Sequence, residues 1–121
     1  MSQSVSAPEE LRVSPDRRML VVVFPGGARD EFSAEFLRVL SPSAEVQGHA
    51  PEQRKTVGGK KDVTIANVLP IGHYAVRIVF SDGHDSGIYT WSYLAELGRE
   101  KDQRWQGYLA ELQAKGLKRE R

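Results

Sequence analysis

The sequence predicts an α+β fold, mainly antiparallel β-sheet, with a short helix after the first hairpin and a C-terminal helix. The run Met19–Phe24 is apolar at every position, which indicates a central strand covered on both faces. Residues Tyr74–Phe80 alternate instead, as in a strand with one face on the core. A third stretch, near the C-terminus, repeats apolar side chains with helical spacing. Strands followed by helices in this way are typical of the α+β class.

The first hairpin is bounded by turn residues. Leu11–Val13 is a short strand candidate, and Ser14–Arg18 forms a turn before the apolar run. Pro25–Gly27 forms the next turn, and Ala28–Phe32 returns as a strand that pairs with the run.

A short helix follows this hairpin. Ser33 is a good N-cap residue, and Glu35 places a negative charge in the first turn, where the helix dipole favours it. Pro42 ends the helix, since the residue before proline avoids the helical conformation. The apolar face of the helix consists of Phe36, Leu37 and Leu40.

The second half of the chain returns to strands. Residues 43–62 show no pattern and are predicted to form a long surface loop. Strand character resumes at Val63–Val68, Leu69–His73 forms a turn, and Gly87–Thr90 is a last short strand. Between them, the alternating strand is expected to face the core with Tyr74, Val76, Ile78 and Phe80.

From Ser92 onward the pattern is helical. Gly98 is predicted to break or kink this helix, and Gly116 is a natural C-terminal stop. Between them lies an amphipathic stripe made of Trp105, Tyr108, Leu109 and Leu112. Because this stripe is too apolar to stay in water, we expect it to pack on the domain or on a second subunit of a homodimer.

Length and composition indicate a single domain. The chain has 121 residues, of which 40% are hydrophobic, enough for one core. We divide it into a disordered tail (1–8), the domain body (9–97), the C-terminal amphipathic helix (98–117) and a charged tail (118–121).

Charge and hydropathy argue against several classes of protein. The formal net charge is +1, which does not favour binding to nucleic acid or to a membrane surface. The longest apolar run is far shorter than the ~20 residues that span a bilayer, and the first residues lack the pattern of a secretory signal. The absence of cysteine fits a reducing compartment. We therefore expect a soluble, cytoplasmic protein that binds protein partners.

The stretch Phe80–Trp91 carries the candidate site. His84 lies between Asp82 and Asp85, where an apolar strand runs into a polar turn. Three interpretations stay open: a hairpin turn, a histidine that binds a ligand or metal, and a base oriented by a carboxylate. His49, in another polar loop, is expected to join His84 at a divalent-metal site with the carboxylates of Asp82 or Asp85.

No catalytic motif accompanies these residues. The sequence contains no H-x-D pair, no H-E-x-x-H and no G-x-S-x-G, so the facial iron triad and the usual zinc-protease and serine-hydrolase signatures are missing. No serine is singled out as a nucleophile. We expect no enzyme activity, and a small hydrolase is only the third hypothesis.

Three blocks of sequence together resemble a known family. They are Phe36–Arg38 with Ser41–His49, then Gly72–Val76, and then Phe80–Leu94. Together they look like the small domain at the N-terminus of gamma-butyrobetaine hydroxylase, which also occurs as a stand-alone bacterial protein of unassigned function. The resemblance covers roughly residues 11–97.

This resemblance implies an α+β domain that is not catalytic. In the hydroxylases it binds a structural zinc through three cysteines and a histidine, whereas iron and 2-oxoglutarate bind in a separate barrel. The histidine corresponds to His84, and the cysteine positions fall near Ser41, Ser43 and Val46. Since none of these three supplies a thiolate, the cysteine-based zinc site is expected to be lost. A similar appendage on iron–sulfur carrier ATPases implies handling of iron–sulfur or metal cofactors.

Our first hypothesis is therefore a non-catalytic interaction or adaptor domain with a link to metal-cofactor handling. The alternative is a metal-binding module that holds zinc or iron through His84 and nearby histidine and aspartate residues. No obligate cofactor is expected.

Overall fold

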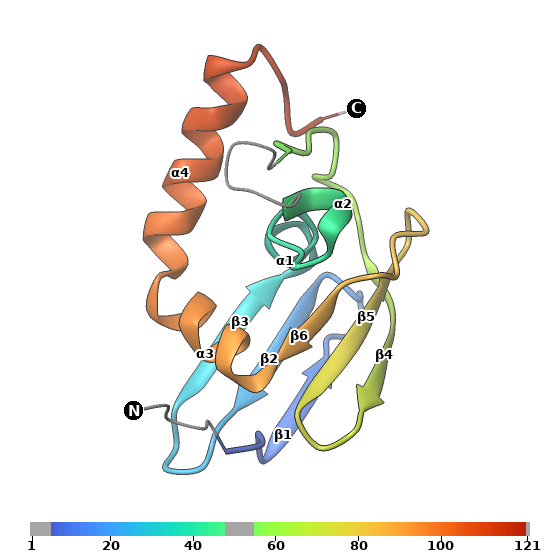
Figure 1. The fold of residues 1–121 in the computed structure, drawn as a ribbon, viewed down its shortest axis with the longest axis vertical. Coiled ribbons are helices and arrows are strands. Elements are labelled where there is room, and N and C mark those ends of the chain that lie inside the picture. Colours follow the sequence, from blue (N-terminus) through green and yellow to red (C-terminus); the bar gives the residue numbers. More distant parts are fainter. Residues whose placement is uncertain (1–5, 48–54, 121) are drawn as a thin grey trace.

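The computed structural model describes residues 6–47 and 55–120 and contains two antiparallel three-stranded sheets with helices beside and between them (Figure 1). This arrangement confirms the predicted α+β class. Its strands are β1 (Glu10–Val13), β2 (Met19–Val23), β3 (Arg29–Ser33), β4 (Ile65–Ile71), β5 (Ala75–Phe80) and β6 (Ile88–Thr90). Its helices are α1 (Ala34–Val39), α2 (Ala44–Gln47), α3 (Trp91–Arg99) and α4 (Lys101–Ala114).

The first sheet has the order β1-β2-β3, so the apolar run forms its central strand as predicted. The predicted hairpin is also present, with Val23 opposite Arg29 and Met19 opposite Ser33. Leu20 and Val22 are completely buried, because this face of the sheet packs on the core.

The second sheet has the order β4-β5-β6. Val76, Ile78 and Phe80 point into the core as predicted, but Tyr74 does not and is 56% exposed. Tyr74 lies in the turn before β5, where its amide donates to the carbonyl of Ile71, and it is therefore outside the alternation of the strand.

Two loop predictions were wrong in part. Residues 69–71 were expected to form a turn but continue β4, with Pro70 opposite Val76. Proline is tolerated there because β4 is an edge strand. The predicted long loop begins with the short helix α2, stabilised by bonds from the amides of Val46 and Gln47 to the carbonyl of Ser43.

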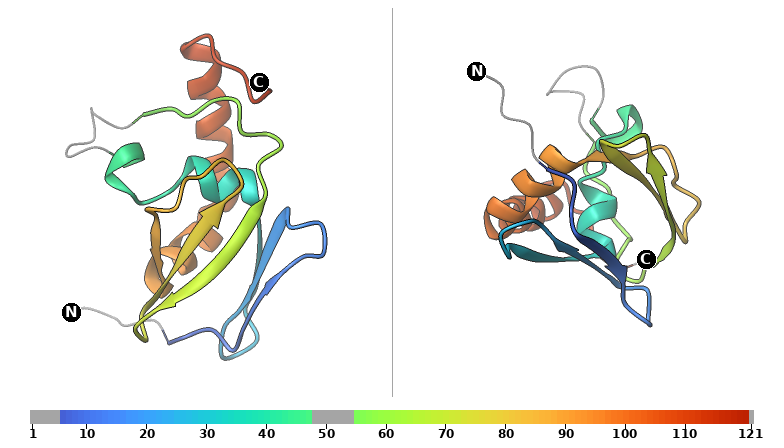
Figure 2. Two further views of the ribbon diagram at one scale, coloured as in Figure 1. Left: turned by 90° about the vertical axis from the view of Figure 1, so that its right-hand side faces the viewer. Right: turned by 90° about the horizontal axis from the view of Figure 1, so that it is seen from below.

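Helix α1 lies between the two sheets (Figures 1 and 2). It starts as predicted, because the hydroxyl of Ser33 accepts a hydrogen bond from the amide of Phe36 at 3.0 Å. Phe36 and Leu37 are buried in the same core cluster as the inner faces of both sheets. This position brings the end of α1 close to the turn that follows β5.

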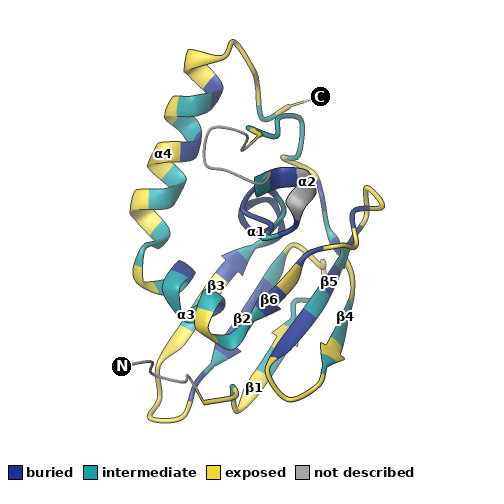
Figure 3. Cartoon of the chain, in the orientation of Figure 1, coloured by how far each residue is buried: buried dark blue, intermediate teal, exposed yellow. Residues whose placement is uncertain are grey.

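Helices α3 and α4 close the remaining side. Thr90 caps α3 through its hydroxyl, and α3 runs through Gly98 to Arg99, so the break comes at Glu100 and not at the glycine. In α4, Tyr108 and Leu112 are buried in the core, and the exposed positions of the helix face away from the domain (Figure 3). The apolar stripe therefore packs on its own domain, one of the two predicted outcomes.

The segment after α4 folds back onto the domain. The carbonyls of Lys118 and Arg119 accept hydrogen bonds from the amides of Gly59 and Lys61 at 2.8 and 3.0 Å. The guanidinium of Arg119 also binds both carboxylate oxygens of the buried Glu35, at 2.8 and 2.9 Å. Within the described residues, none of the helices has the length and apolar character to cross a bilayer.

Candidate functional site

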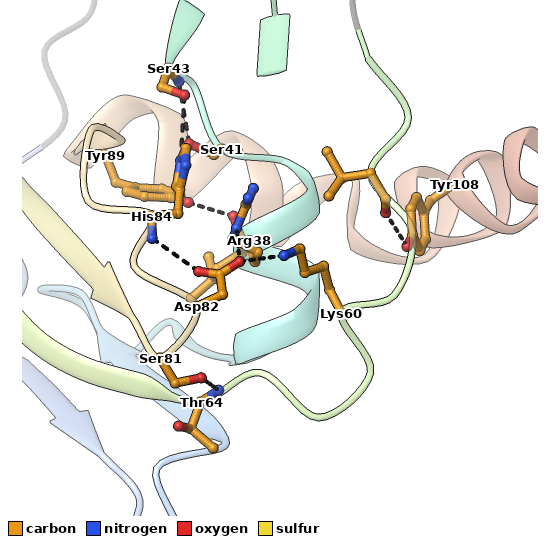
Figure 4. A network of polar contacts seen from close by, with 12 residues as sticks. Arg38, Ser41, Ser43, Lys60, Thr64, Ser81, Asp82, His84, Tyr89 and Tyr108 are labelled. Atoms are coloured by element: carbon orange, nitrogen blue, oxygen red, sulfur yellow. Dashed lines mark hydrogen bonds and ion pairs between the residues drawn. The ribbon is translucent and has the colours of Figure 1, made fainter. Parts of the chain in front are cut away.

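Two turns that are far apart in the sequence meet beneath the end of α1. The imidazole Nε2 of His84 lies 2.9 Å from the hydroxyl of Ser41 and 3.4 Å from that of Ser43 (Figure 4). All three residues are buried, and Ser41 has no exposed surface. We refer to Ser41, Ser43 and His84 as the serine–histidine cluster.

Local sequence explains why His84 points inward. Gly83 has a φ of +90°, and the amide of Phe80 donates to the carbonyl of His84 at 2.9 Å, which closes the predicted hairpin turn. The amide of His84 also donates to a carboxylate oxygen of Asp82 at 3.0 Å. These bonds fix the backbone of the turn and leave the imidazole facing the segment after α1.

Gly87 closes the other side of the cluster. A Cβ atom at this position would lie 2.5 Å from the hydroxyl oxygen of Ser41 and 3.1 Å from the ring of Tyr89. The backbone therefore packs directly on the hydroxyl. Tyr89 itself is completely buried and donates its hydroxyl to the carbonyl of Leu37. Burial raises the pKa of Tyr89 above its usual range, so it remains a neutral donor.

Asp82 is the electrostatic centre of the same turn. Its carboxylate lies 2.8 Å from Nε of Arg38 and 2.6 Å from Nζ of Lys60 (Figure 4). Burial alone would raise the pKa of Asp82, but hydrogen bonds from Lys60, the amide of His84 and Arg38 together hold it well below its usual range. The carboxylate is therefore ionised and already bound by two cations.

The arrangement limits the chemistry of the cluster. The short contact between Ser41 and His84 resembles a nucleophile and its base. However, the carboxylate of Asp82 contacts the backbone of His84 and two cations, so Asp82 does not orient the imidazole as the aspartate of a catalytic triad does. Because the Ser41 hydroxyl is buried under Gly87, the cluster is built for hydrogen bonding inside the domain.

The structure brings only some of the predicted site residues together. Asp82 and His84 share the turn, Asp85 is exposed, and His49 lies outside the described residues. Among the described residues, no group of three or more histidine, cysteine or acidic side chains has an arrangement that could hold a metal ion. The metal site that uses these four residues therefore stays a prediction.

Sequence reasoning did not assign Arg38 or Lys60 to the site. Arg38 lies 44 residues from Asp82, and Lys60 comes from the segment predicted only as loop. Neither residue has a local pattern that signals the contact, because tertiary packing alone creates it. The predicted interaction residues have a different environment: Tyr108 and Leu112 are buried in the core, whereas Trp105 and Leu109 are half-buried.

The two antiparallel sheets and the buried serine–histidine cluster between α1 and the turn after β5 define a class of small α+β domains. The model of the family described as gamma-butyrobetaine hydroxylase-like, N-terminal, matches residues 11–95. This chain belongs to that family. A search of curated proteins found no match to it.

The chain is also similar to solved structures. Two solution structures determined by NMR are similar over nearly the whole chain. The first is 42% identical, with a TM-score of 0.82, and the match covers 97% of this chain and 92% of that chain. The second is 39% identical, with a TM-score of 0.83, covering 98% and 90%.

A crystal structure from Acidithiobacillus ferrooxidans is also similar. Its protein is described as one of unknown function in the DUF971 family, which is the same family. It is 37% identical, with a TM-score of 0.65, and the match covers 80% of this chain and 98% of that chain.

The structure also tests whether the zinc implied by the resemblance fits these residues. Three of the four corresponding positions come together, since the hydroxyls of Ser41 and Ser43 lie within hydrogen-bond distance of His84. The fourth, Val46, is buried in α2. Zinc in structural sites prefers thiolate and imidazole ligands. One imidazole, two hydroxyls and an alkyl side chain do not provide them, so the position is held by hydrogen bonds.

Proposed function

We propose that this domain is a non-catalytic interaction module that binds a protein partner through the outer face of the second sheet. The single observation that carries the proposal is an apolar surface with an arginine at its centre. The register places Asn67, Leu69, Ile71, Ala75, Arg77, Val79, Ile88 and Thr90 on the outer face, where Asn67 is the polar exception on β4 and Ala75 is completely buried.

Strand register defines this surface. Arg77 pairs with Leu69 on one side and with Ile88 on the other, so these three side chains form one row across the sheet. Since Val76 and Ile78 point into the core, the row points away from it. In the left view of Figure 2, no described helix lies over this face.

The side chains on this face are unusual for free surface. Ile88, a large apolar side chain of this face, is 42% exposed. Nε of Arg77 is buried and has no hydrogen-bond partner within the described part of the chain. A buried donor without a partner has a free-energy cost of about 1–3 kcal/mol. A partner carboxylate that binds Arg77 would remove that cost.

Arginine and aromatic residues are enriched where interfaces bind most strongly, and exposed apolar patches frequently mark such sites. The surface therefore fits a protein partner that combines apolar side chains with an acidic residue. This supports the interaction or adaptor hypothesis; the link to metal-cofactor handling remains a further proposal about the identity of the partner.

The test is site-specific photo-crosslinking in the cell that expresses the protein. A photoreactive residue at Ile88 should capture one discrete partner, and the same residue at the exposed position Gln106 of α4 should not. Ile88→Asp should abolish capture from a second probe at Leu69, in the same row of side chains, while the melting temperature stays unchanged. Equal capture from Ile88 and Gln106, or capture that survives Ile88→Asp, would contradict the proposal.

A further inference from the structure

A pocket of about 480 Å³ lies between the β2–β3 hairpin and α3, on elements that carry none of the serine–histidine cluster. Its lining is mostly apolar and includes Phe24, Pro25, Ala28, Ala95 and Gly98. Two charged side chains, Asp30 and Arg99, and the polar residue Ser6 also line it. The volume falls in the range of about 300–1,000 Å³ that is usual for small-ligand sites.

The two charges lie at different depths. Phe24 is buried and Asp30 is half-buried, whereas Pro25 and Arg99 are exposed. The carboxylate of Asp30 has no hydrogen bond or ion pair within residues 6–47 and 55–120, although Arg99 lines the same pocket. Partial burial removes part of the hydration of this carboxylate, so a cation beside it would replace the lost water contacts.

Gly98 explains how the carboxylate fits there. A Cβ atom at position 98 would collide with Asp30, at only 2.6 Å from its carboxyl carbon. The absent side chain lets the carboxylate lie directly against the backbone of α3. Glycine inside a helix is less stable than alanine, but at position 98 it leaves room for an acidic group inside an apolar pocket.

We propose that this pocket binds an organic cation with an apolar body, such as an ammonium or guanidinium group on a short alkyl chain. The alkyl part replaces water on Phe24 and Ala95, and the cation pairs with Asp30. Such a pair is strengthened where apolar walls lower the local dielectric constant. Arg99, at the exposed edge, carries a like charge and reduces the affinity.

The test uses NMR titration of the ¹⁵N-labelled chain with butylammonium, and with butanol and butyrate as neutral and anionic probes of similar size. Butylammonium should shift the amide signals of Ala28, Ala95 and Gly98, and the other two probes should shift them far less. The tripeptide acetyl-Ala-Lys-Ala-amide forms a further arm, which distinguishes a free cation from a lysine side chain on a partner. Equal shifts with butanol, or stronger shifts with butyrate, would overturn the proposal.

Variants make the test specific to Asp30. Asp30→Asn should weaken butylammonium binding by about tenfold, and Asp102→Asn on the exposed side of α4 should not change it. Arg99→Gln should strengthen binding, since it removes the like charge. Unchanged affinity in Asp30→Asn, with a folded amide spectrum, would overturn the assignment, and so would weaker binding in Arg99→Gln.

Discussion

Replacing Arg119 with methionine is expected to lower the free energy of unfolding by about 2 kcal/mol. The side chain of Glu35 is only 5% exposed, and both its oxygens bind the Arg119 guanidinium, whose side chain is 36% exposed. Removing Arg119 would leave an ionised carboxylate inside the domain without its counter-charge. Methionine keeps most of the apolar stem, so the change isolates the charge.

The magnitude lies between two known limits. Breaking a fully buried pair costs about 3–5 kcal/mol, whereas an exposed pair is worth about 0–1 kcal/mol. Water reaches Arg119 but hardly reaches Glu35, which places the expected loss between these values. With a typical slope of about 2 kcal/mol per molar urea, the unfolding midpoint should fall by about 1 M.

Urea unfolding followed by circular dichroism measures this loss. The matched control is Arg29→Met, because Arg29 pairs with Glu31 where both side chains are about half exposed (52% and 49%); its cost should stay below about 0.5 kcal/mol. Adding Glu35→Gln to Arg119→Met should restore more than half of the loss, since no buried charge remains. The reasoning fails if Arg119→Met costs no more than Arg29→Met, or if Glu35→Gln gives no rescue.

The other predictions concern the turn that carries the site. Gly87→Ala should cost about 1–3 kcal/mol through overpacking, whereas Gly107→Ala, with open space around it, should be neutral or stabilising; equal effects would refute the packing argument. Because its partners lower the pKa of Asp82, the stability from its carboxylate is complete above about pH 4 and is lost as pH falls towards the depressed pKa; acid unfolding of Asp82→Asn should therefore be flatter below about pH 4. A strong chelator should leave the melting temperature unchanged, and a clear drop would show that metal holds the fold. In a zinc or nickel titration, the ring signals of His49 and His84 should shift together and more than those of the third histidine; separate behaviour would exclude a shared site.

Local patterns were sufficient for most of the fold. The N-cap at Ser33, the hairpin on either side of Pro25–Gly27 and the Asp82–Gly83 turn depend on short-range geometry, and the structure contains all three. The prediction that Tyr74 faces the core was wrong, because alternation alone does not show where a turn ends and a strand begins. The predicted helix break at Gly98 was also wrong. This glycine makes room for Asp30 of β3, and helix propensity takes no account of a contact with another element.

The site was only half predictable for the same reason. A histidine in a polar turn is visible in the sequence, but its partner Ser41 lies 43 residues away. A serine that directly follows a helix is ordinarily interpreted only as part of the helix end. Lys60 lies in a stretch without periodicity and reaches Asp82 only because the neighbouring residues pair with the C-terminal segment. Contacts of this kind depend on the packed core, so no local pattern indicates them.

The position of the Arg119 guanidinium also has an optical consequence. It lies 5.1 Å from the centre of the Trp105 indole, and the only other tryptophan, Trp91, donates its ring N–H to the carbonyl of His73. A positive charge over an indole alters its excited state, so the emission of Trp105 should change when the C-terminal segment detaches. In a Trp91→Phe background, intrinsic fluorescence would follow release of this segment separately from global unfolding, with no added dye.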